Sequence, residues 1–343
     1  MTEKINKTSM KHFFLIILLF ASCSNDAQPT TAKHNPVINQ DFPDPTVILA
    51  PDGNYYAYAT NATQNGDWIN IQVASSTDLF NWTYIGDALP QKPTWASATQ
   101  NYWAPHVLYD AAIKQYVMFF CAKSNDTTYG MCIGVAFSSS PTGPFVDKGS
   151  PLMKGKDFKV LDPMAMIDSK TKKKIMYWGS DFAPISATQL TDDWKDTVPG
   201  STVAVLPTNK EKDYTKLVEG AWVDYHDGKY YLYYSGDNCC GDNANYAVMV
   251  ARADNAFGPF TRLGETRAGN SSVILAKDNT WFAPGHNSIV HDKNGNIWIA
   301  YHAIWKTEAD SVRAQKQNKY VRRVLCIEPV VYENGWPGVE IKY

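Results

Sequence analysis

The sequence carries little charge of either sign. Its 343 residues include 32 Lys or Arg and 34 Asp or Glu, which leaves a formal net charge of −2. Charged residues make up 19% of the chain, below the roughly 25% usual for soluble domains. Proteins that bind nucleic acid or an anionic membrane surface present a basic patch, so both kinds of partner are disfavoured.

Cysteines are few, and none stands in a metal-binding pattern. The chain has 6 cysteines, no pair of Cys-x-x-Cys motifs and no His-Glu-x-x-His motif. This excludes a disulfide-rich scaffold and gives a zinc site no support. Adjacent Cys239 and Cys240 form either a vicinal disulfide or two free thiols. In either state we expect the pair to shape its loop rather than to react.

Long apolar runs are also missing. The run Phe13–Phe20 has eight residues, too few to span a bilayer as a helix. Three lysines precede this run and Ala21-Ser22-Cys23 follows it, a pattern that resembles the signal peptide and lipobox of bacterial lipoproteins. We therefore expect residues 1–22 to be a lipoprotein signal peptide, Cys23 to carry the lipid, and residues 23–35 to be a polar tether.

This assignment predicts an exported bacterial lipoprotein, either periplasmic or at the cell surface on the outer membrane. The protein would meet the membrane only through its N-terminal lipid. Cleavage without lipidation and an uncleaved signal anchor are the alternatives, because short motifs also match by chance.

Aromatic residues, by contrast, are plentiful. The chain has 11 Trp, 20 Tyr and 14 Phe. Aromatics favour β-strands, and their flat apolar faces also suit stacking against a ligand such as a sugar ring. Composition alone leaves both explanations open.

A repeat organises the chain after the tether. Each copy opens with a short polar element, often followed by proline, and the copies can be aligned on one ionisable residue each: Asp44, His106, Asp162, Glu219 and His286. The intervals between these residues are 62, 56, 57 and 67. A regular period of this length is typical of β-propellers, in which one repeat forms one blade.

Within each copy the pattern predicts four antiparallel strands. An apolar strand follows the opening, then a turn and a second, aromatic-rich strand, as in Tyr55–Ala59, Tyr116–Phe120 and Tyr230–Tyr234. Asp227-Gly228 and Asn294-Gly295 are typical of tight hairpin turns. We therefore predict an all-β fold, a single five-bladed β-propeller of four-stranded blades over residues 36–343. A two-sheet sandwich would not repeat the same internal order.

The geometry of a propeller brings the openings together. Because the first strand of each blade lines the central channel, the five aligned residues are expected to meet at one end of it. Several ionisable groups in one cleft indicate a functional site. The loops after the second strands should border the same site; they include Asn61–Trp68, Ser124–Gly130, Gly236–Asn245 and Ala303–Lys319.

Two carboxylates placed on opposite sides of a bond are the minimum for glycoside hydrolysis. Glu219 has apolar neighbours that would raise the pKa of its carboxyl toward the working pH, so it is the expected general acid. Asp44, across the axis, is the expected base that activates water. Asp162 is the expected third member, which modulates the pKa of Glu219 and orients it.

The openings also resemble a known family. Phe42-Pro43-Asp44-Pro45, Val160-Leu161-Asp162-Pro163 and Val218-Glu219-Gly220-Ala221-Trp222 are similar, in this order and spacing, to glycoside hydrolase family 43. Its members are five-bladed propellers that cleave arabinose- and xylose-containing polysaccharides with inversion. The resemblance implies the same roles for the three carboxylates.

Further site residues follow from the resemblance and the repeat together. They give Trp103, His106, Trp222 and Arg323 as substrate-binding residues. His286 matches a residue that holds an axial cation or water, often calcium in arabinan-cleaving members. The resemblance therefore implies no required cofactor and allows one axial Ca²⁺.

The acid segment reads Glu-Gly-Ala-Trp where many members have Glu-Gly-Pro-Trp, which weakens the subfamily assignment. The openings do not match the fructan-cleaving propellers. We predict a monomeric, inverting hydrolase of α-L-arabinofuranosyl linkages in arabinan or arabinoxylan, with exo or endo action. The alternatives are a β-xylosidase, a galactofuranosidase, or a propeller lipoprotein that binds glycan without cleaving it.

Overall fold

A computed structural model describes residues 1–2, 35–209, 214–241, 243–266, 271–314 and 321–341. Two units are distinguished, Met1–Thr30 and Thr31–Tyr343, and all described helices and strands belong to the second. Nearly all of the predicted signal peptide and of the predicted tether, Cys23 included, lies outside the described residues. In the described ranges, no helix combines the length and apolar character needed to cross a bilayer.

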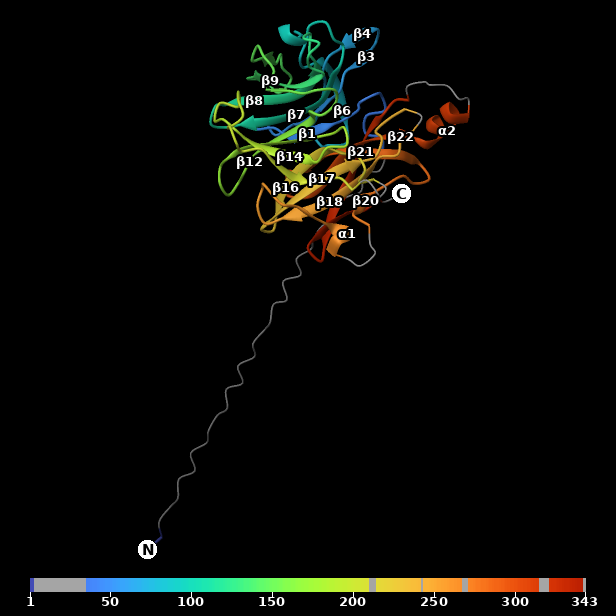
Figure 1. The fold of residues 1–343 in the computed structure, drawn as a ribbon. Coiled ribbons are helices and arrows are strands. Elements are labelled where there is room, and N and C mark those ends of the chain that lie inside the picture. The colour runs from blue at the N-terminus through green and yellow to red at the C-terminus, as the bar shows by residue number, and fades with distance from the viewer. Residues whose placement is uncertain (3–34, 210–213, 242, 267–270, 315–320, 342–343) are drawn as a thin grey trace. The chain divides into compact units, whose positions relative to one another are not determined.

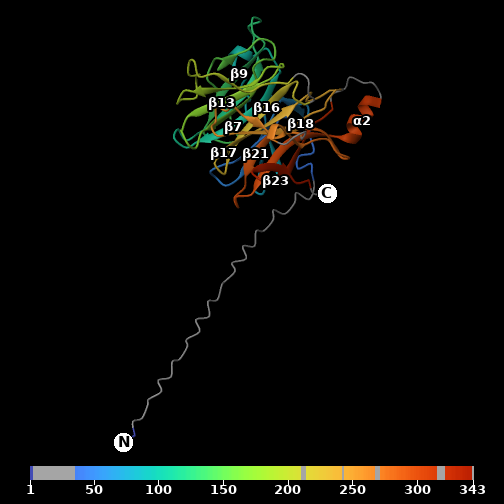
Figure 2. The same cartoon turned by 60° about the horizontal axis from the view of Figure 1, so that its bottom comes forward.

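Five antiparallel sheets form the blades of a five-bladed β-propeller, and the chain passes from one blade to the next in sequence order (Figures 1 and 2). The first blade contains β1 (Thr46–Leu49), β2 (Tyr55–Ala59), β5 (Gln72–Ser76) and β6 (Trp82–Asp87). A hairpin of β3 (Ala62–Gln64) and β4 (Asp67–Ile69) follows β2, and a short 3-10 helix spans Thr94–Ala96.

The other four blades repeat this order. The second blade contains β7 (Tyr102–Asp110), β8 (Gln115–Lys123), β9 (Met131–Ser138) and β10 (Val146–Asp147), with β11 (Met153–Lys154) also paired to β9. The third contains β12 (Leu161–Ile167), β13 (Lys174–Gly179), β14 (Ile185–Leu190) and β15 (Val203–Leu206).

The fourth blade contains β16 (Val218–His226), β17 (Lys229–Gly236), β18 (Ala247–Ala253) and β19 (Thr261–Arg262), and β20 (Val273–Leu275) also pairs with β18. The fifth contains β21 (Trp281–His291), β22 (Ile297–Trp305), β23 (Val324–Glu333) and β24 (Trp336–Val339). Two helices, α1 (Leu263–Thr266) and α2 (Lys306–Ala314), lie in connections. The predicted five-bladed fold is confirmed.

The hairpin turns follow the local sequence. Between β16 and β17, Asp227 and Gly228 have φ values of 43° and 82°, and His226 pairs with Lys229 across the turn. A two-residue hairpin turn of this kind needs positive φ at both positions, which Asp and Gly tolerate better than other residues. The Asp-Gly pair thus sets the register of the fourth blade.

The hydrophobic core lies between the blades. Each of five apolar clusters combines residues from two neighbouring blades, so that together they close the ring. The second strands supply much of this packing: all five residues of β2 and all six of β13 are buried. Most aromatics therefore stabilise the contacts between blades, as their strand propensity indicated.

The segment before β1 joins the first and last blades. The backbone of Ile38 pairs with Leu325 of β23, and the N–H of Phe42 donates to the carbonyl of Arg323 at 2.8 Å. Asn35, the last residue of the predicted tether, bonds to both the carbonyl and the N–H of Ile327 through its side chain. This segment holds the two ends of the ring together.

One connection differs from the sequence-based interpretation. The stretch Ala303–Lys319 was expected to be a loop, but β22 continues to Trp305 and α2 follows directly. The helix has a Lys306–Asp310 ion pair at 2.7 Å across one turn. It is short and largely polar, so it lacks the apolar periodicity by which helices are recognised in a sequence.

Candidate active site

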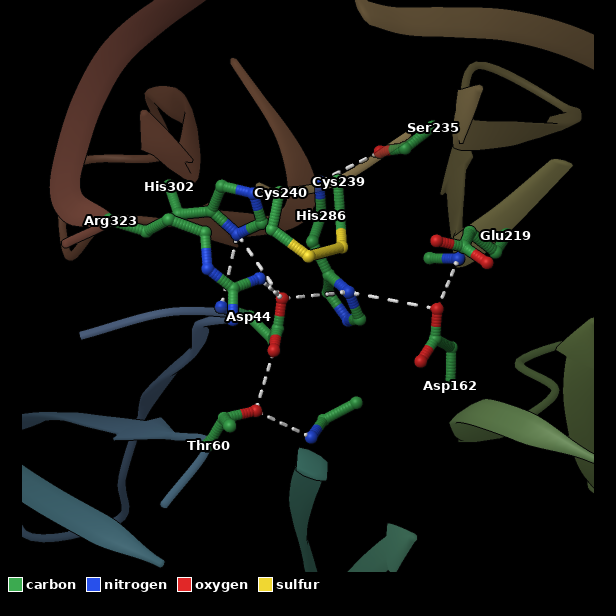
Figure 3. A network of polar contacts seen from close by, with 12 residues as sticks. Asp44, Thr60, Asp162, Glu219, Ser235, Cys239, Cys240, His286, His302 and Arg323 are labelled. Carbon is green, nitrogen blue, oxygen red and sulfur yellow. Dashed lines mark hydrogen bonds and ion pairs between the residues drawn. A yellow bond between two sulfur atoms is a disulfide. The ribbon is translucent and has the colours of Figure 1, made fainter. Parts of the chain in front are cut away.

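A cavity of about 1390 Å³ lies where the first strands of the blades begin, and all five blades contribute to its walls. Six of the predicted residues line this cavity: Asp44, Trp103, Asp162, Glu219, His286 and Arg323. Figure 3 shows Asp44 and Asp162 on either side of His286, with Glu219 beside Asp162. The cavity is larger than the roughly 300–1,000 Å³ of a typical small-molecule pocket, so it has room for more than one sugar.

A shared backbone bend places these side chains. At the equivalent position of each blade, one residue has a left-handed φ between 48° and 57°: Asp44, Ala104, Asp162, Gly220 and Ala283. In blades two to five the pairing of the first and second strands is interrupted at this point. Non-glycine residues seldom adopt such a φ, and it is often found at functional sites.

The bend corrects the alignment used for the second and fifth blades: in the fifth, the residue equivalent to Asp44 is Ala283, and His286 lies three residues further along β21. In the second, the residue equivalent to Asp44 is Ala104, and His106 lies two residues further along β7. His106 is only 4% exposed and does not line the cavity. Burial lowers the pKa of its imidazole to about 4, so the ring is neutral and belongs to the packed interior of the channel.

Trp222 also lies away from the cavity. Its ring packs against His106, with the ring centroids 5.1 Å apart, and it contacts the apolar clusters on both sides of the fourth blade. The interrupted pairing in β16 occurs between Glu219 and Trp222. Direct sugar contact by His106 or Trp222, as predicted from the sequence, is not supported by these positions.

Asp44 is surrounded by cationic and polar groups. Its Oδ1 lies 2.8 Å from Arg323 Nη1, 3.2 Å from His302 Nδ1 and 3.5 Å from His286 Nδ1. Thr60 donates to Oδ2 at 2.6 Å. Burial alone would raise the pKa of Asp44, but the positive charge of Arg323 holds that pKa well below its ordinary value. Asp44 is therefore an ionised carboxylate.

The partners of Asp44 are themselves fixed. Thr60 accepts the N–H of Ala104 at 2.9 Å, so its hydroxyl hydrogen is directed to the carboxylate. His302 Nδ1 accepts the N–H of Asp44 at 3.1 Å, and burial lowers the pKa of His302 to about 4. The ring of His302 is thus neutral and orients the Asp44 backbone.

Glu219 is held in a different environment. Ser180 donates a hydrogen bond to Glu219 Oε2 at 2.5 Å, and the hydroxyl of Tyr246 donates to Oε1. The side chain is only 9% exposed. Burial raises the pKa of Glu219, with a further contribution from the charge of Asp44, although the two hydroxyls and Arg323 oppose this shift. Glu219 therefore retains a proton to higher pH than an ordinary carboxyl.

Asp162 acts on the backbone next to Glu219. Its Oδ2 accepts the N–H of Gly220 at 3.0 Å and lies 3.8 Å from His286 Nδ1. Burial and the charges of Glu219 and Asp44 raise the pKa of Asp162 well above its ordinary value. Asp162 and Glu219 thus form a buried carboxyl pair that favours protonation, opposite the ionised Asp44.

His286 lies between Asp44 and Asp162, as Figure 3 shows. The backbone N–H of His286 donates to the hydroxyl of Ser235 at 2.7 Å. Burial lowers the pKa of the imidazole ring. No cluster of three potential His, Cys, Asp or Glu ligands occurs among the residues that the structure describes, whereas Ca²⁺ requires six to eight ligands, preferably oxygen. The side chains do not by themselves form a calcium site.

The outer wall of the cavity is partly apolar. Trp68, Phe158 and Phe182 line it and are 37%, 51% and 55% exposed. Trp103 stacks on Phe158, with ring centroids 6.3 Å apart and planes 7° from parallel. Exposed aromatic faces in a polar cavity suit the apolar faces of sugar rings.

The remaining wall comes from the fourth and fifth blades. Cys239 and Cys240 are joined by a disulfide that lines the cavity (Figure 3), which resolves the alternative left open by the sequence. From α2, Glu308 lines the cavity and forms an ion pair with Arg322 at 2.7 Å.

Four residues that contact the carboxylates were not found from the sequence: Thr60, Ser180, Tyr246 and His302. Thr60 and Ser180 directly follow the second strands β2 and β13. Both therefore stand at the start of loops that follow second strands, which are the loops expected to border the site. Tyr246 and His302 lie just before and within strands, where nothing in the local sequence separates them from packing residues.

Comparison with known proteins identifies the family of this chain. The model of glycosyl hydrolases family 43 matches residues 33–337. A protein of Aspergillus flavus named probable arabinan endo-1,5-alpha-L-arabinosidase A is 26% identical over 312 residues, which cover 86% of this chain and 90% of that protein.

Solved structures share the fold. A thermostable family-43 glycoside hydrolase matches with a TM-score of 0.71 and 25% identity, covering 90% of this chain and 96% of the other. An endo-1,4-beta-xylanase from Bacteroides thetaiotaomicron matches with a TM-score of 0.69 and 25% identity over 88% and 95% of the two chains.

The five-bladed fold together with the family match identifies a carbohydrate-cleaving propeller. The chain belongs to family 43 of the glycosyl hydrolases and is a glycoside hydrolase. The predicted family and enzyme class are thus confirmed.

Proposed function

We propose that this protein hydrolyses α-L-arabinofuranosyl linkages in arabinan-type polysaccharides with inversion at the anomeric carbon. One observation carries the proposal: Asp44 and Glu219 line the same cavity, and their surroundings shift the two pKa values in opposite directions. Carboxyls with opposite shifts are what a base and an acid require. The arabinan specificity rests on the name of the Aspergillus flavus relative.

In the proposed reaction Glu219 gives its proton to the glycosidic oxygen as the bond to the anomeric carbon breaks. Asp44 accepts a proton from the water that attacks the opposite face of that carbon. A carboxylate has about four acceptor positions, so Asp44 can bind this water while it remains bonded to Arg323 and Thr60. The products are a sugar of inverted configuration and the free hydroxyl of the leaving sugar.

Asp162 has a positioning role in this scheme. By accepting the N–H of Gly220 it fixes the backbone on which Glu219 stands. It also modulates the pKa of Glu219, because within this buried pair a charge on either carboxyl disfavours ionisation of the other. The reaction requires no cofactor, and the axial Ca²⁺ expected at His286 stays a prediction that activity after treatment with a chelator would test.

The roles of the two carboxylates can be tested by Asp44→Asn and Glu219→Gln. We expect each variant to lose turnover of arabino-oligosaccharides by at least about 100-fold while still binding them in calorimetry. Asp254→Asn and Glu333→Gln, at exposed positions outside the cavity, are matched controls that should retain activity. Normal turnover in either test variant would contradict the mechanism. Proton NMR of the first-formed anomer distinguishes inversion from retention.

Activity on xylose polymers is a second candidate because one similar structure is named endo-1,4-beta-xylanase. Product profiles on arabinan, arabinoxylan, aryl β-xylosides and aryl galactofuranosides separate the candidates and also distinguish exo from endo action. If the wild-type protein binds these glycans but cleaves none of them, the alternative of a non-catalytic glycan-binding propeller is favoured.

We further propose export as a monomeric lipoprotein, periplasmic or at the cell surface, lipidated at Cys23. The support is the sequence of the first 23 residues, with three lysines, a short apolar run and a small residue before the cysteine. Metabolic labelling with a fatty acid should mark the wild type and not Cys23→Ser. Light scattering of the protein without its signal peptide tests the monomer.

A further inference from the structure

The turn between β13 and β14 has an unusual backbone. Ser180, Asp181 and Phe182 have φ values of 152°, 54° and 60°, and the N–H of Ala183 donates to the carbonyl of Ser180 at 3.1 Å. Both central residues of this turn are left-handed, a conformation normally occupied by Asn-Gly or Asp-Gly. A phenylalanine there is strained, and strain of this kind is retained where function requires it.

The Phe182 side chain gains little from burial in return. It is 55% exposed and lines the cavity. A large apolar ring that is both strained and exposed would be replaced by glycine if only stability mattered. Its position in the cavity therefore indicates a ligand contact.

The same turn also donates a hydrogen bond to the proposed acid, Glu219. Ser180, two residues before Phe182, donates to Glu219 Oε2. The groups that hold Asp44 come instead from the first and fifth blades, through Thr60 and Arg323. In an inverting reaction the acid stands on the side of the leaving sugar and the base on the side of the attacking water.

From this placement we infer that the Ser180–Ala183 turn is a subsite for the sugar on the leaving side of the cleaved bond. Phe182 contacts that sugar. Ser180 is a positioning residue that directs the proton of Glu219 to the glycosidic oxygen, which departs with the leaving sugar. The inference rests on the proposed function. It explains why one strained turn carries both residues, because binding of the leaving sugar and alignment of the acid are then linked.

The test compares two substrates, an arabino-oligosaccharide and α-L-arabinofuranosyl azide. The azide has no leaving sugar, and its leaving group departs without a proton. For Phe182→Gly we expect kcat/KM on the oligosaccharide to fall about tenfold, the value for the azide to stay within about twofold, and the thermal unfolding midpoint to rise because the strain is removed.

Lys172→Gly is the matched control for Phe182→Gly. Lys172 is an exposed residue with a φ of 61° in the preceding turn of the same blade, and it does not line the cavity. This variant should be stabilised in the same way without a change in kinetics on either substrate.

Ser180→Ala and Ser180→Gly remove the hydroxyl, and the glycine variant also relaxes the backbone. For both we expect kcat on the oligosaccharide to fall about tenfold while turnover of the azide is retained. The alkaline limb of the pH profile should move to higher pH, because a donor that stabilises the ionised form of Glu219 is lost. Ser186→Ala, in β14 and outside the cavity, is the control.

Two outcomes are distinguishable. If wild-type protein turns over neither substrate, the proposed function itself is wrong. If wild type is active but Phe182→Gly and Ser180→Gly affect both substrates equally, or match Lys172→Gly and Ser186→Ala, then the leaving-sugar subsite is wrong and the function stands.

Discussion

Each oxygen of the Glu219 carboxyl accepts a hydrogen bond from a hydroxyl, one from Ser180 and the other from Tyr246. Burial raises the pKa of Tyr246 well above its ordinary value, so Tyr246 stays protonated and donates throughout the working pH range. A fixed donor of this kind stabilises the ionised acid and keeps its carboxyl in one orientation.

Tyr246→Phe should therefore change the pH dependence as well as the rate. We expect the pKa of Glu219 to rise when the donor is lost, so the alkaline limb of kcat/KM moves to higher pH, with a fall of about tenfold in kcat. Tyr177→Phe is the control, because it also removes one buried hydroxyl, bonded at 2.7 Å to the carbonyl of Ala256. An unmoved alkaline limb in Tyr246→Phe would contradict this role.

The acidic limb of the pH profile of kcat/KM depends on Asp44 and Arg323. Their contact at 2.8 Å keeps the pKa of Asp44 low, so the base remains ionised in acid. Arg323→Lys retains a positive charge but loses the planar guanidinium geometry. We expect the pKa of Asp44 to rise and the acidic limb of kcat/KM to move to higher pH, measured side by side with the control Arg252→Lys, at a half-buried residue that does not line the cavity. Identical acidic limbs would remove Arg323 from this role.

At the scale of strands, β21 fixes the position of Tyr246. A Cβ at Gly285 would lie 2.2 Å from Cδ2 of the Tyr246 ring. Gly285 is therefore required for the close approach of the two elements rather than for an unusual φ. The first strand of the fifth blade thus acts on the acid carried by the fourth blade.

Gly285→Ala should displace the Tyr246 ring from Glu219. We expect a loss of about 1–3 kcal/mol in the free energy of unfolding and a fall in kcat. The double variant with Tyr246→Phe should fall little further, because both changes act through the same hydroxyl. Gly338→Ala in β24 of the same blade is the control, because its added Cβ would lie 3.9 Å from its nearest neighbour, the carbonyl oxygen of Val331. Additive losses in kcat would exclude this explanation.

Most strands could be predicted because each repeat has the same order of strands and turns. The carboxylates could be predicted because they stand beside the left-handed bend, at Asp44, Asp162 and, one residue earlier, Glu219. The predictions for His106 and His286 were aligned two and three residues late, because Ala104 and Ala283, which occupy the bend in those blades, have no ionisable side chain to mark it. The hydroxyl donors were missed because their partners are distant in sequence, 39 residues apart for Ser180 and Glu219.

At the scale of the whole molecule, Glu328 lies where the first and last blades are joined. The carboxyl of Glu328 accepts a hydrogen bond from Asn35 Nδ2 at 2.7 Å, and Glu328 is 4% exposed. Burial raises the pKa of Glu328 to about 7. A carboxyl with a raised pKa in the folded state reduces stability as the pH rises from its unfolded pKa through its folded pKa.

Glu328→Gln should remove this pH dependence while Gln still accepts from Asn35. We expect similar unfolding midpoints for variant and wild type at about pH 4, and a more stable variant at about pH 8, where wild type must ionise a buried group. Glu333→Gln, exposed on the same strand, is the control. A difference that does not change between the two pH values would show that ionisation of Glu328 is not responsible.

The left-handed bend also has a consequence for redesign. The five blades share this backbone position, but only Asp44 and Asp162 line the cavity from it, whereas Ala104 and Ala283 are 2% and 0% exposed and do not line it. A larger side chain at either alanine would have to displace the packing around it. A redesign that adds a functional group at the bend is therefore confined to the blades whose bend residue already reaches the cavity.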